Sequence, residues 1–110
     1  MHERKALMSE LSDGFISLPG GIGTIEETFE MFTWMQLGIH LKPVSLLNIK
    51  GFFDGLRHFL ETMVKQGFLL KQHLDMLIIE PDIHSLINRL ETYEPEIVEK
   101  WFDKEKNRAI

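Results

Sequence analysis

The segment from residue 15 to residue 27 constrains the fold most, because in it a short apolar run meets a glycine-rich turn. Residues 15–18 have the composition of a buried parallel strand. Pro19 cannot continue a hydrogen-bonded ladder, since proline has no N–H group. Three of the four residues 20–23 are glycine, which permits tight or positive-φ turns and lets a ligand approach the main chain closely. A helical pattern follows, so the segment predicts the strand–turn–helix unit of a parallel α/β protein.

The start of this helix is a candidate anion site. The N–H groups of Gly21 to Thr24 would lack helical acceptors and would point outward with the positive end of the helix dipole, which suits phosphate. The same residues also have a purely structural interpretation. Thr24 and Glu27 have the spacing of a capping box, in which their side chains satisfy the first N–H groups of a helix. Glycine-rich turns of this kind also occur in proteins that bind nothing there, so the residues alone leave both interpretations open.

Beyond this unit, apolar runs of strand length alternate with amphipathic stretches of helix length. Gly38 and Gly67 predict helix ends, Asp54 and Asp82 predict N-caps, and Pro95 predicts a first helical position. The expected strands cover residues 14–18, 44–49 and 76–80, a turn lies near 70–74, and the expected helices cover residues 2–11, 24–37, 54–66, 82–90 and 95–106. This alternation predicts an α/β fold with a parallel sheet.

Composition excludes several classes of function. The formal net charge of −5 argues against binding to nucleic-acid backbones, which requires a basic face. The chain has no cysteine, and its five histidines have no zinc-site spacing and are expected on the surface or on helices. No apolar run is long enough to cross a membrane, and no signal-peptide pattern is visible. We therefore expect a cytoplasmic protein that uses no metal or other cofactor and binds no membrane.

The chain resembles the Lonely Guy (LOG) family, whose signature is P-G-G-x-G-T-x-x-E preceded by an Arg-Lys pair. Residues 19–27 carry the signature, and Arg4 and Lys5 form the pair. The resemblance continues through residues 33–38, 42–44, 46–48 and 67–68. It implies a phosphoribohydrolase, in which water cleaves the N-glycosidic bond of a nucleoside 5′-monophosphate to release a free base and ribose 5-phosphate. Cytokinin riboside monophosphate and AMP are the implied substrates.

The resemblance also implies which part of the fold is present. Family chains carry an earlier strand–helix–strand half, so residues 1–110 are expected to form a single LOG-like domain without that half. The expected architecture is a partial Rossmann-like parallel sheet of about three strands flanked by helices. Two other functions stay open, namely a non-catalytic nucleotide-binding module and a truncated, inactive product that only self-associates. Base specificity is not predicted, because the pocket for the base draws on the absent half.

Individual residues gain roles from the resemblance. Arg4 and Glu27 are the catalytic candidates. A guanidinium can hold phosphate or ribose oxygens at two points, and a carboxylate can stabilise positive charge on the sugar and orient or deprotonate water. The remaining substrate contacts are Lys5, Gly20, Gly21, Ile22, Gly23, Thr24, Ile25, Glu26 and Thr33.

The helix over residues 24–37 carries a further prediction. At about 100° per residue, Ile25, Phe29 and Phe32 share a face that should pack on the sheet, while Trp34 lies well round toward the other side. A helix that is apolar on so much of its circumference is covered by more than its own sheet. Members of the family dimerise through this region, so we expect a homodimer through helix 24–37.

Overall fold

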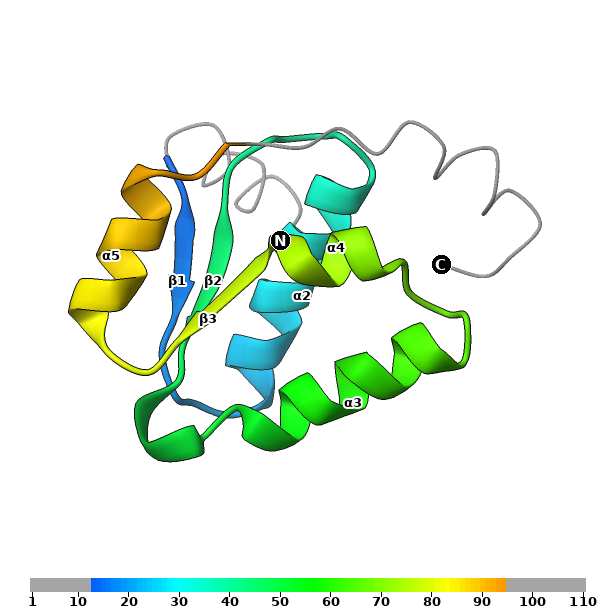
Figure 1. The fold of residues 1–110 in the computed structure, drawn as a ribbon, viewed down its shortest axis with the longest axis horizontal. Coiled ribbons are helices and arrows are strands. Elements are labelled where there is room, and N and C mark those ends of the chain that lie inside the picture. Colours follow the sequence, from blue (N-terminus) through cyan, green and yellow to red (C-terminus); the bar gives the residue numbers. More distant parts are fainter. Residues whose placement is uncertain (1–12, 95–110) are drawn as a thin grey trace.

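The computed structural model describes residues 13–94, and Figure 1 shows how their elements are arranged. In chain order these are β1 (Phe15–Ser17), α2 (Ile22–Gln36), β2 (Val44–Leu47), the short 3₁₀ helix η1 (Ile49–Gly51), α3 (Asp54–Lys65), α4 (Lys71–Met76), β3 (Leu77–Glu80) and α5 (Ile83–Glu91). The helices expected over residues 2–11 and 95–106 lie outside the described residues. None of the helices in the described part is long and apolar enough to cross a membrane.

The three strands form one parallel sheet in the order β1-β2-β3. Phe15 of β1 pairs with Val44 of β2, which pairs in turn with Leu77 of β3. Helix α2 connects the first two strands, and helices α3 and α4 connect the second to the third. The predicted α/β class, with a three-stranded parallel sheet flanked by helices, is confirmed. In such a sheet the carboxyl ends of all strands meet at one edge, where ligands of α/β proteins bind.

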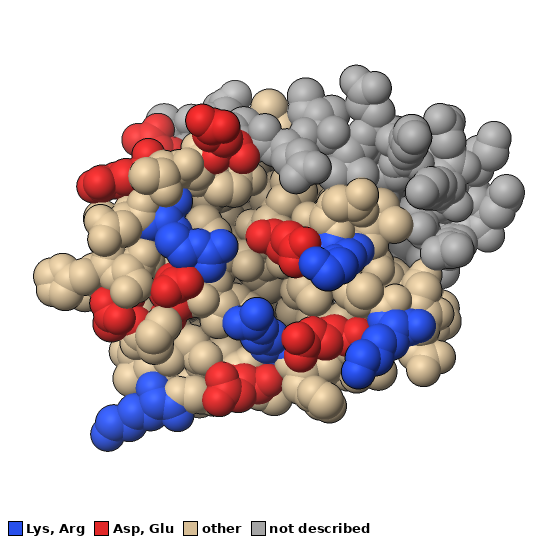
Figure 2. Space-filling model, in the orientation of Figure 1, with Lys and Arg blue, Asp and Glu red and all other residues tan. Residues whose placement is uncertain are grey.

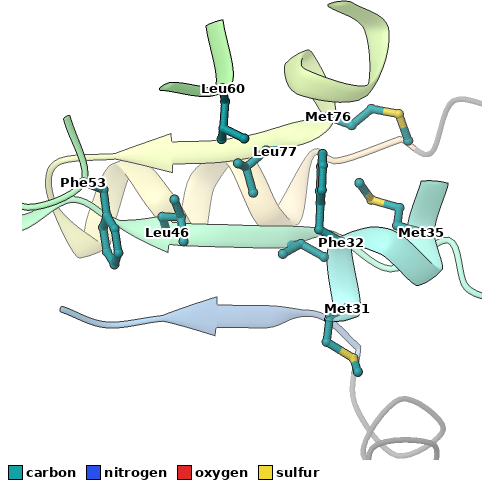
Figure 3. Packing of buried hydrophobic residues seen from close by; sticks show 9 residues of the cluster. Met31, Phe32, Met35, Leu46, Phe53, Leu60, Met76 and Leu77 are labelled. Carbon is teal, nitrogen blue, oxygen red and sulfur yellow. The ribbon is translucent and has the colours of Figure 1, made fainter. Parts of the chain in front are cut away.

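Helices cover both faces of the sheet. Successive residues of β2 point to opposite faces, so Leu46 packs with α2, α3 and α4, whereas Leu47 packs with α5. Figure 3 shows side chains from these three helices converging on the first face. Each apolar side chain of this size stabilises the fold by about 1.5–3 kcal/mol when fully buried. The larger core consists of Met31, Phe32, Met35, Val44, Leu46, Phe53, Leu60, Met76 and Leu77.

Helix α2 packs on the sheet with the predicted face. Phe32 is buried in the core, and Ile25 and Phe29 pack against it from partly buried positions. Met31 and Met35 are also buried, so the chain's own core covers much of the apolar circumference of α2. Trp34 is half-buried against the same core.

The predicted start of α2 is wrong by two residues. The helix begins at Ile22, with Gly21 as the N-cap and without a side-chain capping hydrogen bond. The capping box of Thr24 and Glu27 is therefore not formed, because both residues already lie inside the helix. The C-terminal end agrees with the prediction, since Gly38 follows α2 with a φ of +75°.

The later boundaries show two more differences. Asp54 is the first residue of α3 and not its N-cap, and the side-chain oxygen of Asn48 instead accepts a hydrogen bond from the Phe53 N–H at 2.6 Å. The turn expected near residues 70–74 is part of helix α4, which is held by the buried side chains of His73 and Met76. The cap of α5 is confirmed, since the Asp82 carboxylate accepts a hydrogen bond from the Ser85 N–H at 2.9 Å.

The histidines are not all at the surface or on helices. His73 is buried in α4, where its Nδ1 lies 3.2 Å from the side-chain nitrogen of Gln36. His40 is buried in the loop between α2 and β2, which contradicts the expectation from sequence. Burial is compatible with these polar rings because each has a hydrogen-bond partner.

Candidate functional site

The glycine-rich turn places the N-terminus of α2 next to the carboxyl end of β1. Gly21 adopts an extended conformation, with φ −99° and ψ −156°. The Ile25 N–H donates to the Gly21 carbonyl oxygen at 3.2 Å, which closes the first turn of the helix. The N–H groups of Ile22, Gly23 and Thr24 precede this bond and have no acceptor within the helix. Together with the positive end of the helix dipole, they form a set of donors suited to an anion.

The three glycines of the turn matter for space rather than for a positive φ. None of Gly20, Gly21 and Gly23 has a positive φ, so of the tight or positive-φ turns that the sequence allowed, the positive-φ one is not formed here. Space favours glycine at position 20, because a Cβ atom there would collide with the Thr24 hydroxyl unless that side chain moved. At Gly21 and Gly23 a Cβ atom would meet nothing within 4 Å. Their missing side chains therefore leave the helix N-terminus open to a ligand.

A surface hollow of about 370 Å³ lies between β1 and the first turns of α2. Glu27 reaches it from the second turn of α2, where its side chain is exposed. Within residues 13–94 no hydrogen bond or ion pair holds the Glu27 carboxylate, which leaves it available to a ligand. The lining consists of Gly14, Phe15, Ile16, Ser17, Leu18, Pro19, Thr24, Glu27, Thr28 and Met31.

A chain of hydroxyl groups joins the two walls of this hollow. The Ser17 hydroxyl at the end of β1 is hydrogen-bonded to the hydroxyl of Thr28, which is buried in α2. The Thr28 hydroxyl also donates to the main-chain oxygen of Thr24 at 2.7 Å. Sequence reasoning did not single out Ser17 or Thr28. The four-residue spacing of Thr24 and Thr28 on the helix was the available signal.

The predicted site residues are not all brought together. Thr24 and Glu27 line the hollow. Ile25 packs against the core, and the next residue, Glu26, is exposed but does not line the hollow. Thr33 is nine residues beyond Thr24, about 13 Å along the helix axis, and does not line the hollow. Gly20 and Gly21 form the turn, and Ile22 and Gly23 begin α2. Arg4 and Lys5 lie outside the described residues.

A second hollow of about 400 Å³ lies between α3, α4 and β3, away from the glycine-rich turn. Charges of both signs surround it: Lys71 pairs with Asp75 at 3.0 Å, and Arg89 pairs with Glu80 at 2.8 Å. Figure 2 shows basic and acidic side chains interspersed over one face of the molecule. Mixed charge of this kind is typical of a solvated surface and of a protected sheet edge. The hollow beside the glycine-rich turn is therefore the better candidate site.

Fold and site together define a parallel α/β protein with an open, glycine-rich helix N-terminus at the carboxyl edge of its sheet. A family model described as "Possible lysine decarboxylase" matches residues 1–90. The chain belongs to this family.

Curated relatives are similar over most of the chain. In Oryza sativa subsp. japonica, "Probable cytokinin riboside 5'-monophosphate phosphoribohydrolase LOGL9" is 50% identical over 95 residues, or 86% of this chain and 42% of the relative. A second rice protein, "Cytokinin riboside 5'-monophosphate phosphoribohydrolase LOG", is 49% identical over 96 residues, which cover 87% of this chain and 40% of the relative. In Arabidopsis thaliana, "Cytokinin riboside 5'-monophosphate phosphoribohydrolase LOG7" is 46% identical over 99 residues, which cover 90% of this chain and 46% of the relative. The chain thus spans less than half the length of these relatives.

Proposed function

We propose that this chain forms part of a phosphoribohydrolase, which splits nucleoside 5′-monophosphates such as cytokinin riboside monophosphate or AMP into free base and ribose 5-phosphate. The observation that carries the proposal is that hydrogen-bond donors and a carboxylate acceptor lie beside the same hollow. The N–H groups of Ile22 to Thr24 suit a phosphate, and the Glu27 carboxylate, which has no partner among residues 13–94, lines the adjacent hollow. The names of the relatives agree with this chemistry.

The reaction assigns a separate task to each group. Cleavage of an N-glycosidic bond builds positive charge on the sugar as the base departs. The Glu27 carboxylate would stabilise this charge and orient or deprotonate the attacking water. The turn at Gly20 and Gly21, together with the first N–H groups of α2, would hold the 5′-phosphate and fix the sugar in place. Arg4 and Lys5 are proposed as further cationic contacts to the substrate.

We also propose further substrate contacts, a homodimer and a cellular location. Glu26 and Thr33 are proposed as contacts to the sugar side of the substrate, and Ile22 and Ile25 as contacts through the turn. Homodimerisation through helix 24–37 is supported by the half-buried side chain of Trp34. A cytoplasmic location is proposed from the absence of cysteine in the chain.

Base release from AMP and adenosine, offered side by side and followed by chromatography, tests the proposed function. The chain is assayed alone and together with the portion of the rice LOG relative that lies outside the match. We expect adenine to be released from AMP at least when both parts are combined. Much less adenine should come from adenosine, because the phosphate anchors the sugar. Equal turnover of adenosine would contradict the phosphate anchor. Phosphate binding without any base release would favour a non-catalytic binding module.

A further inference from the structure

The hydroxyl chain beside the glycine-rich turn has a fixed direction. The Thr28 hydroxyl carries one proton, and it donates that proton to the Thr24 carbonyl oxygen at 2.7 Å, because a carbonyl oxygen can only accept. In its bond with Ser17, the Thr28 oxygen is therefore the acceptor. The single proton of the Ser17 hydroxyl is thus committed to Thr28 and is not available to a ligand in the hollow.

Ser17 consequently offers its surroundings only acceptor capacity. Its oxygen keeps lone pairs that no other described residue uses, and its side chain lines the hollow. Glu27 lines the same hollow with a carboxylate, which also accepts hydrogen bonds. The N-terminus of α2 provides donors instead. The site therefore has a donor end at the N-terminus of α2, which suits an anion, and acceptors on β1 and on α2, which suit hydroxyl groups.

We propose that Ser17 is a specificity residue that accepts a hydrogen bond from a ribose hydroxyl of the bound nucleotide. Thr28 is its positioning residue, since it holds the Ser17 proton away from the ligand. The inference rests on the proposed function, because it requires a sugar phosphate in the hollow. A phosphate oxygen without a proton gains nothing at Ser17, so the phosphate is directed to the helix N-terminus and the sugar hydroxyls to the acceptors Ser17 and Glu27.

Calorimetric titration of the chain with small ligands tests this division without requiring catalysis. The ligands are inorganic phosphate, ribose 5-phosphate, and its 2-deoxy and 3-deoxy analogues. We expect the native chain to bind ribose 5-phosphate about three- to tenfold more tightly than one of the deoxy analogues, the range for one neutral hydrogen bond. Ser17→Ala should abolish this preference and leave the affinity for inorganic phosphate unchanged.

Substitutions of Thr28 test the direction of the hydroxyl chain. Thr28→Val keeps the shape of the side chain but frees the Ser17 proton, so the preference for ribose 5-phosphate should fall. Thr28→Ser retains a hydroxyl and should restore the preference. The double variant Ser17→Ala with Thr28→Val should show no further loss, because both changes remove the same interaction.

Ser45→Ala is the matched control. The Ser45 hydroxyl donates to the Phe15 carbonyl oxygen of β1 at 2.7 Å, but Ser45 is fully buried and does not line the hollow. This variant should lose stability and keep the ribose preference. A full preference in a folded Ser17→Ala variant would overturn the inference while phosphate binding stands. If the native chain bound none of the phosphates, either alone or together with the remaining portion of the rice LOG relative, the proposed function would fail, and the inference with it.

Discussion

The imidazole of His40 joins the loop before β2 to helix α2, since its Nε2–H donates a hydrogen bond to the Met31 main-chain oxygen at 2.9 Å. Its Nδ1 accepts a hydrogen bond from the Lys42 N–H at 3.1 Å, which requires the neutral ring with the proton on Nε2. The ring also packs against Phe15 of β1, with 5.4 Å between ring centroids. His40 thus ties together β1 and α2, the two elements that frame the candidate site.

This arrangement predicts a loss of stability in mild acid. Burial lowers the pKa of His40 below its ordinary value of 6.5, because the charged ring loses solvation. A group whose pKa is lowered by folding stabilises the native state above its unfolded pKa, and the contribution is lost as the pH falls. We therefore expect the free energy of unfolding to decline from about pH 6.5 downward, toward the lowered pKa of His40. Denaturant titrations at several pH values measure this decline.

His40→Gln should flatten the decline, because the variant has no group that must remain neutral at this position. His58→Gln is the matched control, since His58 is exposed on α3 and its removal should leave the slope nearly unchanged. Identical pH profiles for the native chain and the His40 variant would show that another group is responsible.

Gly23→Ala should affect ligand binding without reducing the stability of the fold. A Cβ atom at this helical position would meet nothing within 4 Å, and Gly23 does not have a positive φ that alanine would have to adopt. The variant should therefore be as stable as the native chain, or more stable by about 0.5–1 kcal/mol. Its methyl group would stand among the free N–H groups, so the affinity for inorganic phosphate or ribose 5-phosphate should fall. Thermal unfolding and calorimetric titration give the two readouts.

Gly55→Ala provides the control for this prediction. Gly55 is also near the start of a helix, α3, and a Cβ atom there also meets nothing within 4 Å. This variant should gain similar stability and bind phosphate as the native chain does. A Gly23 variant that binds phosphate normally would argue against a ligand at the N-terminus of α2.

Much of the fold could be predicted because periodicity records which side chains face the sheet, as it did for Phe29 and Phe32. The start of α2 could not, since the capping-box spacing of Thr24 and Glu27 favoured a start at Thr24. In the fold, Gly21 serves as the N-cap and the helix includes Gly23. Helix α4 was missed because six residues are too short for a periodic pattern, and its stability comes from buried tertiary contacts.

The site shows the same division between local and tertiary information. Thr24 and Glu27 belong to a contiguous motif, so their common position beside the turn could be predicted. Ser17 lies in a short strand and Thr28 in the second turn of a helix, and neither residue belongs to the contiguous motif. Their hydrogen bond depends on how β1 packs against α2 across eleven residues of sequence. A pattern read along one segment does not contain that packing.

Glu27→Gln is expected to remove hydrolysis and preserve the fold. Because the carboxylate is exposed and forms no cap, the free energy of unfolding should change by less than about 0.5 kcal/mol. Base release should fall about a hundredfold or more, because a neutral amide neither stabilises positive charge on the sugar nor takes a proton from water. Glu61→Gln makes the same chemical change on the exposed surface of α3 and should leave base release unaffected. Native-like base release by the Glu27 variant would remove this residue from the mechanism.

The exposed side of β1 predicts that the isolated chain associates with itself. Within the described residues β1 pairs only with β2, and the neighbouring apolar side chains of Ile16 and Leu18 are 42% and 56% exposed. An open strand edge flanked by apolar side chains is a template for pairing with another chain. Light scattering should therefore detect species larger than a monomer at high micromolar concentration.

Ile16→Lys should reduce this association, because a charge beside a strand edge disfavours pairing with a second strand. Phe68→Lys is the control, since it places the same charge at another exposed apolar position, in the loop after α3. Association lost in the first variant and kept in the second would locate the contact at β1. If both variants associate as the native chain does, the contact lies elsewhere, and the exposed part of helix α2 becomes the surface to substitute next. A stable monomer whose amides along residues 15–18 are protected from exchange would contradict the prediction, because it would mean that the edge is already covered.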